Sequence, residues 1–346
     1  MLRVAIIGVG TMGHVHTDAY QQMPDVDLVG VYDADPARAQ AFAEARGLST
    51  VYPSAEALIG DVDVVDVCTP TPAHAEYVLA ALYAGRDVVC EKPMARSLAD
   101  CARLIAAAKE SGRTLMPAQV LRFFPEYSSA TAVIRQGAVG NPATIRTRRG
   151  GPFPRATNDW YGDFAQSGGV TLDTIIHDFD WLRWTFGEVE YVYAKASYYN
   201  HPTPLDHLDY SLVTLKFRSG AVAQVEGTWA EPGSFSVFLE VCGDAGMIHF
   251  DSMESVPLRV NRRQQGGAVG GVAVPESPTS ANGYYLELRH FIDCVQAGTT
   301  PTITPVDGYY AVEIALAALE SARTGKRVAI QGPPARVIAE RMPVAA

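Results

Sequence analysis

The stretch that decides the fold is Leu2-Arg3-Val4-Ala5-Ile6-Ile7 followed by Gly8-Val9-Gly10-Thr11-Met12-Gly13. The apolar run predicts a buried strand, and the residues after the glycines, to about Gln22, are typical of a helix. Between a strand and a helix, the first glycine permits a tight turn, the second lets the backbone approach a pyrophosphate, and the third lets the helix pack closely. The pattern predicts a dinucleotide site formed by Gly8, Gly10, Thr11, Met12 and Gly13.

The acid expected to select the dinucleotide is Asp33, which follows a second predicted strand, Val26–Tyr32, twenty residues after Gly13. A carboxylate at this spacing accepts hydrogen bonds from ribose hydroxyls and repels a 2′-phosphate. It therefore favours NAD over NADP. Two alternatives remain open: Asp33 could cap a helix at Pro36–Arg46, and Arg38 could reach a phosphate.

The first part of the chain continues to alternate between strands and helices, with strands expected at 62–68, 87–90 and 114–119 and helices at 73–84 and 97–111. This alternation predicts a doubly wound parallel sheet, an N-terminal Rossmann domain over residues 1–120. In such a sheet the ligand lies across the carboxyl ends of the strands. The further candidate cofactor-binding residues follow those ends: Thr69, Pro70, His74, Glu91, Lys92 and Gln119.

The second part has a different texture, which we assign to a substrate-binding and oligomerisation domain over residues 121–346. Alternating segments at 189–198, 208–217, 221–229 and 235–241 predict a large, mostly antiparallel open sheet. Helices are expected at 172–185, 284–297 and 306–324. Residues 264–283 are rich in Gly, Pro and Ser and predict a long mobile loop that serves as a lid.

A polar stripe marks the first of these helices. Asp173 and His177 are four residues apart, so one continuous helix would present both on one face, together with Asp180. A carboxylate there can fix the tautomer of the imidazole or hold its proton. An isolated Asp/His pair of this kind is as often structural as catalytic.

Taken together, these motifs resemble the glucose–fructose oxidoreductase and inositol dehydrogenase (Gfo/Idh/MocA) family. The motifs are the glycine-rich turn, Thr69-Pro70, Glu91-Lys92-Pro93, and Gly168-Gly169 followed by Asp173 and His177, and the resemblance spans residues 2 to about 325. It implies a Rossmann domain followed by an open-sheet α/β domain. It also implies that Lys92, Asp173 and His177 are catalytic. The peptide at the position of Lys92-Pro93 is often cis in this family, so the resemblance also implies a cis peptide here.

The resemblance implies hydride transfer, which needs these residue types. An alcohol carbon gives up hydride readily only as its oxygen loses a proton, and an aliphatic hydroxyl with a pKa of roughly 16 does not ionise unaided. Lys92 would donate to the developing alkoxide and His177 would take the proton near neutral pH. Asp173 would orient His177 or bind a second hydroxyl. We expect no metal, and which of Lys92 and His177 finally holds the proton stays open.

Candidate substrate-facing residues lie in segments that border the cleft in similar proteins: Arg122, Trp160, Tyr161 and Tyr284. Aromatic rings with one polar tip suit sugar faces, although Trp and Tyr more often simply pack. The cluster of Arg146, Arg148, Arg149 and Arg155 could meet an acidic substrate, but a solvated strand face is the preferred interpretation.

Composition limits the partners. The chain has 346 residues, 48% hydrophobic and 19% charged, with a net charge of −10, which argues against nucleic acid and anionic membrane surfaces. Five widely spaced cysteines without a metal-ligand pattern predict reduced thiols. The apolar run Leu2–Ile7 is too short for a signal peptide or a membrane span. We expect a cytoplasmic protein that forms a homodimer or homotetramer.

These observations predict an NAD-dependent oxidoreductase that transfers hydride from a secondary alcohol of a cyclitol, sugar or polyol, as an inositol dehydrogenase does. Two alternatives come from other classes. One is an NAD-dependent glycosidase or lyase that oxidises its substrate transiently and returns the hydride. The other is a regulator that binds NAD without catalysis, which a complete set of Lys92, Asp173 and His177 disfavours.

Overall fold

The computed structural model describes residues 1–197, 210–254 and 282–335, and they form two compact units. Among the described residues, the first unit holds 1–120, 283–310 and 332–335, and the second holds the remainder. The helix at 283–297 thus belongs to the same unit as the N-terminal sheet. The loop expected at 264–283 lies outside the described residues except for its last two positions.

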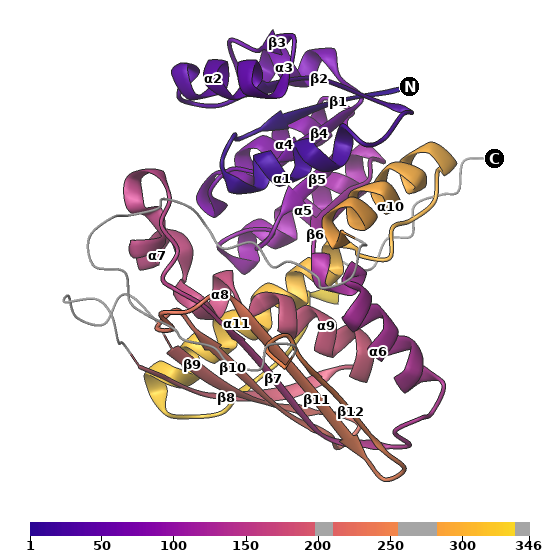
Figure 1. Ribbon diagram of the computed structural model, residues 1–346, viewed down its shortest axis with the longest axis vertical. Helices are drawn as coiled ribbons and strands as arrows, with labels where there is room; N and C mark the ends of the chain where they lie inside the picture. Colours follow the sequence, from indigo (N-terminus) through magenta and orange to yellow (C-terminus); the bar gives the residue numbers. More distant parts are fainter. Residues whose placement is uncertain (198–209, 255–281, 336–346) are drawn as a thin grey trace. The chain divides into compact units, whose positions relative to one another are not determined.

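The first unit is built on a parallel sheet with the strand order β3-β2-β1-β4-β5-β6 (Figure 1). Its central strands are apolar and fully covered, as expected for a parallel sheet with helices on both faces. Asp66 is an exception, because this acid is 0% exposed inside β4. The strands are β1 Leu2–Ile7, β2 Val26–Tyr32, β3 Thr50–Val51, β4 Val64–Val67, β5 Asp87–Glu91 and β6 Leu115–Ala118.

Helices alternate with these strands, and several begin at a side-chain cap. Asp35, Ser54 and Ser97 each accept a hydrogen bond from a backbone N–H of the first turn of the helix that follows. Helix α1 packs against α10, and α4 packs against α3 and α5. The helices of this unit are α1 Thr11–Tyr20, α2 Pro36–Arg46, α3 Ala55–Asp61, η1 Thr71–Ala73, α4 His74–Tyr83, α5 Leu98–Ser111 and α10 Gly283–Ala297.

The second unit is built on a seven-stranded sheet with the order β12-β11-β7-β10-β9-β8-β13. All neighbours in it are antiparallel except β7 and β10, which run parallel with Thr144 beside Val222. Alternate residues along β9 are buried, which is the pattern of a sheet with one covered face. The strands are β7 Pro142–Gly150, β8 Val189–Ser197, β9 Tyr210–Phe217, β10 Val222–Thr228, β11 Ser236–Gly243, β12 Met247–Asp251 and β13 Val328–Ala329.

Helices cover one face of this sheet, with α6, α8, α9 and α11 on the same side (Figure 1). Helix α11 starts in the first unit and continues in the second from Ala311. The helical segments are η2 Val120–Phe123, α6 Pro125–Arg135, η3 Thr157–Gly162, α7 Phe164–Ser167, α8 Gly169–Asp173, α9 Ile176–Phe186 and α11 Pro305–Thr324.

The predicted fold class is confirmed: a parallel Rossmann sheet followed by an α/β unit with a mostly antiparallel sheet. The prediction of one helix over 172–185 is wrong. Helix α8 ends at Asp173 and α9 begins at Ile176, with Thr174 and Ile175 forming a turn between them. No helix in the described ranges has the length and apolarity that a membrane crossing requires.

Candidate active site

The glycine turn has the geometry that a dinucleotide needs. Gly8 has a φ of 101°, and a Cβ added there would lie 2.7 Å from the carbonyl oxygen of Cys68. A Cβ added at Gly13 would lie 2.4 Å from the carbonyl oxygen of Gly8, so the helix packs directly on the turn. At Gly10 an added Cβ would meet nothing within 4 Å, which leaves the backbone of that residue open to a ligand. Each glycine thus meets the requirement that the motif predicts for it.

Asp33 is tied to this turn. Its Oδ2 accepts a hydrogen bond from the Val9 backbone N–H at 3.0 Å, and its Oδ1 accepts one from the Asp35 backbone N–H at 2.9 Å. The Arg38 guanidinium is 3.8 Å from Oδ1. The alternative that Asp33 caps helix α2 is wrong, because Asp35 is the residue that caps it. The Asp33 carboxylate therefore lies beside the glycine turn, where a ribose would be bound.

Polar groups at the ends of β4 and β6 fit the same ligand. Thr69 Oγ1 and both amide atoms of Gln119 are buried, and none has a hydrogen-bond partner among the described residues. Buried polar atoms without partners are costly, so they point to a ligand that supplies hydrogen bonds. Pro70, which follows Thr69, is exposed. These residues fit NAD as the bound group, and Thr11 and Met12, both half-buried, begin the helix that would face its phosphates.

Lys92 follows β5 in a turn that is held from both sides. The Lys92 backbone N–H donates to Glu91 Oε2 at 3.0 Å, and the Pro93 carbonyl lies 2.8 Å from His74 Nδ1. The other nitrogen of His74 is 2.8 Å from the Thr69 carbonyl. The Lys92-Pro93 peptide is cis. His74 is buried and contacts these two carbonyls, so its ring joins the Thr69 loop to the Lys92 turn.

Asp173 receives a directed chain of hydrogen bonds in the second unit. The Trp229 indole N–H donates to Thr174 Oγ1 at 2.8 Å, and Thr174 Oγ1 donates to Asp173 Oδ2 at 3.1 Å. An indole N–H can only donate, so the hydroxyl proton of Thr174 is available for the carboxylate. All three side chains are at least nine-tenths buried. The chain therefore fixes the position of Asp173 Oδ2 as a hydrogen-bond acceptor.

His177 is the second residue of α9, and two buried ion pairs fix the start of this helix. Arg149 Nε donates to Asp178 Oδ2 at 2.8 Å, while Arg122 binds both oxygens of Asp180 at 2.7 and 2.6 Å. The predicted polar stripe of Asp173, His177 and Asp180 on one helix is therefore wrong. The turn at Thr174 and Ile175 separates Asp173 from His177, and Asp180 pairs with Arg122.

The candidate substrate-facing residues divide into different environments. Tyr161 is buried beside Trp229, with ring centroids 6.0 Å apart, and half-buried Trp160 stacks on Tyr161 at 4.0 Å. Arg122 is buried, which its bidentate pair with Asp180 explains. Tyr284 lies in α10 of the first unit and is buried. A series of contacts thus connects Trp160 and Tyr161 to Asp173 through Trp229 and Thr174.

The arginines of β7 correct a further interpretation. The preferred reading of a solvated strand face holds for Arg146, which is exposed and pairs with Glu240, and for half-buried Arg148, which pairs with Glu226 and Glu231. It is wrong for Arg149, which is 1% exposed and points into the core toward Asp178.

Comparison with known proteins decides the family. The model of the GFO_IDH_MocA oxidoreductase family, NAD-binding Rossmann fold, matches residues 2–119, and that of its C-terminal alpha/beta domain matches residues 132–330. The chain belongs to this family. It is an NAD-dependent oxidoreductase.

Relatives of this oxidoreductase act on cyclic polyols and sugars by name. It is 29% identical to the myo-inositol 2-dehydrogenase of Thermotoga maritima over 95% of this chain and 99% of that one. The crystal structure of myo-inositol 2-dehydrogenase from Lactobacillus plantarum matches with a TM-score of 0.81 and 26% identity, covering 95% of this chain and 99% of that one. A levoglucosan dehydrogenase with NADH and levoglucosan matches with a TM-score of 0.82, 26% identity and the same coverage.

Sequence reasoning did not place Thr174 and Trp229 in this network, nor did it pair His16 with Asp66, whose side chains lie 2.8 Å apart in the core of the first unit. A signal for one pair was present. An acid in the middle of the apolar strand Val64-Val65-Asp66-Val67 requires a buried partner. Thr174 and Trp229 are 55 residues apart, and no local pattern joins them.

Proposed function

We propose that this oxidoreductase is a dehydrogenase of a cyclitol, sugar or related polyol and transfers hydride between a secondary alcohol and NAD. The observation that carries the proposal is Lys92, a half-buried ammonium at the end of β5 in the unit that fits NAD, with its turn held by Glu91 and His74. The inositol and levoglucosan dehydrogenases among the relatives support this substrate class.

We assign the catalytic roles to Lys92, His177 and Asp173. Bound NAD supplies a carbon that accepts hydride. The Lys92 Nζ donates to the substrate oxygen as negative charge develops there, and an imidazole nitrogen of His177 takes the hydroxyl proton. Asp173, held in place through Thr174 and Trp229, orients His177 or accepts a hydrogen bond from a neighbouring substrate hydroxyl.

In this proposal the first unit binds the cofactor through the glycine turn, Asp33, Thr69 and Gln119. The second unit binds the substrate, with Trp160 and Tyr161 as the aromatic residues suited to a sugar face. We further propose a cytoplasmic homodimer or homotetramer. The five free cysteines support that location, and the partly exposed Tyr193 and Leu212 of the sheet support self-association.

The test is a screen of free polyols, aldoses, anhydrosugars and uronates, with NADH formation recorded by absorbance. Aryl glycosides are run in parallel, with release of phenol recorded. The proposal predicts one NADH for each free polyol oxidised. Release of phenol at substoichiometric NAD, without NADH build-up and without reaction of free polyols, would instead identify a glycosidase that oxidises its substrate transiently.

A further inference from the structure

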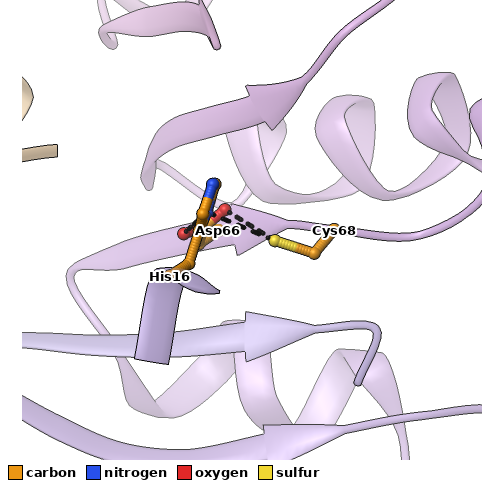
Figure 2. Close-up of side chains that lie close together, drawn as sticks. All are labelled: His16, Asp66 and Cys68. Atoms are coloured by element: carbon orange, nitrogen blue, oxygen red, sulfur yellow. Dashed lines mark hydrogen bonds and ion pairs between the residues drawn. The ribbon is translucent and has the colours of Figure 1, made fainter. Parts of the chain in front are cut away.

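Three polar side chains meet in the core of the first unit, on one face of β4. His16 comes from the buried side of α1. Asp66 lies in β4 and Cys68 directly follows that strand, two residues later, so their side chains point the same way. Figure 2 shows the imidazole beside the Asp66 carboxylate with the Cys68 sulfur next to both. The side chains of His16 and Asp66 are 0% exposed. Burial of this kind requires compensation by partners.

The two ring nitrogens of His16 face two different carboxylates. Nδ1 is in hydrogen-bond contact with Asp66 Oδ2 at 2.8 Å, whereas Nε2 is 3.4 Å from Glu91 Oε1, an ion-pair distance without a hydrogen bond. The Cys68 thiol donates to the other oxygen of Asp66 at 3.4 Å and lies 3.3 Å from Nδ1. A neutral imidazole has only one N–H, whereas an imidazolium has one for each carboxylate. The arrangement therefore matches a charged ring.

A metal ion is a poorer explanation for the same three residues. Their ligand-type atoms lie within 4.8 Å of one another, but Nδ1 and Oδ2 are already in direct hydrogen-bond contact. A metal on Nδ1 would not neutralise Glu91, which lies at the opposite nitrogen of the ring. A proton on each nitrogen neutralises charge at both carboxylates.

The charges around the ring are consistent with a bridging cation. Burial on its own lowers the pKa of His16, but Asp66 and the Cys68 thiol hold it well above its ordinary value. Burial on its own raises the pKa of Glu91, but His16 and Lys92 bring it below its ordinary value. Other titratable groups also act here. Tyr20 on α1 has a pKa raised by burial and by Asp66, Glu287 of α10 acts on Tyr20, and His74 contributes to lowering the pKa of Glu91.

The bridge reaches Lys92 through Glu91. One oxygen of that carboxylate faces His16, and the other accepts the Lys92 backbone N–H at 3.0 Å. A buried carboxylate that is pinned by a cation at one oxygen holds its second oxygen in place. We propose that His16 is a buried imidazolium that bridges Asp66 and Glu91 and thereby positions the turn carrying Lys92. The positioning part rests on the proposed catalytic role of Lys92.

The direct test is nuclear magnetic resonance of the whole protein labelled with ¹⁵N-histidine. The chain has eight histidines, and the signals of His16 are identified because they disappear in a variant that lacks this residue. We expect both ring nitrogens of His16 to carry a proton and to keep imidazolium shifts at about pH 7, where a free histidine is mostly neutral. A neutral tautomer, or titration near the ordinary value, would overturn the bridge. This readout does not depend on catalysis by Lys92.

Two amide variants test positioning, because Asn places an N–H near the position of Nδ1 and Gln places one near the position of Nε2. We expect His16→Asn, which cannot reach Glu91, to lower turnover about tenfold with little change in KM for NAD, and His16→Gln to retain most turnover. Equal turnover in the two variants would overturn positioning through Glu91. If His16→Asn does not fold, positioning stands on His16→Gln alone: near-normal turnover supports it, and a loss of tenfold or more overturns it.

Cys68→Ala is the matched control, since it removes the sulfur while both carboxylates remain. We expect the imidazolium signals and turnover to persist, whereas a metal site would lose a ligand and would respond to chelators and added Zn²⁺. A chelator effect in the wild type, abolished by Cys68→Ala, would contradict the bridge. Lys92→Ala separates the proposed catalytic role of Lys92 from the proposed bridge at His16. Normal turnover in that variant would contradict the catalytic role, while the nuclear magnetic resonance signals of His16 test the bridge independently of turnover.

Discussion

The two units hold buried charge in different ways. In the first, two carboxylates, Asp66 and Glu91, share the single ring of His16. In the second, the buried acids Asp178 and Asp180 each have their own arginine, Arg149 and Arg122 respectively. A guanidinium does not lose its proton in proteins, whereas an imidazole can. The cations of these two arginine pairs are therefore permanent, while the positive charge between Asp66 and Glu91 depends on the protonation state of His16.

The difference also concerns what is positioned. The arginine pairs fix the turn of α9 that carries His177, because each arginine binds directly to an acid of that helix. The His16 bridge acts on the Lys92 turn through Glu91. Of the two groups that the proposed mechanism uses for proton transfer, Lys92 is thus held by a network that can lose its charge, and His177 by one that cannot. Each network can be disrupted without changing the other.

Breaking a permanent pair should have the largest effect. Arg149→Met leaves Asp178 buried without its cation, which we expect to lower the free energy of unfolding by about 3–5 kcal/mol. Arg146→Gln, on the same strand, removes an arginine whose side chain is 59% exposed and should cost less than about 1 kcal/mol. Urea denaturation measures both, and similar losses would contradict the contrast between the two pairs.

The hydrogen-bond chain to Asp173, in the same unit, can be tested with a pair of variants that differ at a single hydroxyl group. Thr174→Val keeps the shape but removes the hydroxyl between Trp229 and Asp173, and we expect turnover to fall about tenfold with NAD affinity unchanged. Thr174→Ser keeps a hydroxyl and should retain at least about half of the turnover. Steady-state kinetics of the two variants decide, and equal activity in both would show that the hydroxyl does not act on Asp173.

The shared ring should make the first unit sensitive to pH. Because the pKa of His16 is raised above its ordinary value of 6.5, its stabilising contribution is complete below that value and is lost as pH rises through the folded-state pKa. The difference in unfolding free energy between wild type and His16→Asn should therefore shrink toward alkaline pH. The difference for Arg149→Met should stay flat. Chemical denaturation at several pH values measures both, and a His16 difference that grows with pH would contradict the bridge.

The smallest effect is expected at Asp33. Asp33→Ser removes the charge beside the glycine turn and should narrow the preference for NAD over NADP about tenfold. Asp35→Ser removes a charge two residues away, keeps a capping side chain for α2, and should leave the preference nearly unchanged. Dissociation constants for the two cofactors test this, and a wild type that prefers NADP would overturn the assignment of Asp33.

The sequence predicted the local features of the candidate site but not those that depend on contacts between distant residues. The glycine turn, Asp33 and the Lys92 turn are local motifs whose spacing is set by one strand and the turn after it, so they were predictable. The helix break at Thr174 was not, because periodicity places apolar residues on both sides of it without interruption. The partners of Arg149 and Arg122 are 29 and 58 residues away, and only packing of the folded unit brings them together.

The most direct test of the account is hydride transfer in Lys92→Ala and His177→Ala, measured as NADH formation from the best substrate of the polyol screen, beside NAD affinity and melting temperature. We expect each variant to lose about a hundredfold or more in turnover while NAD binding and melting temperature stay close to the wild type. Near-normal turnover in Lys92→Ala, with NAD bound as tightly as before, would contradict it.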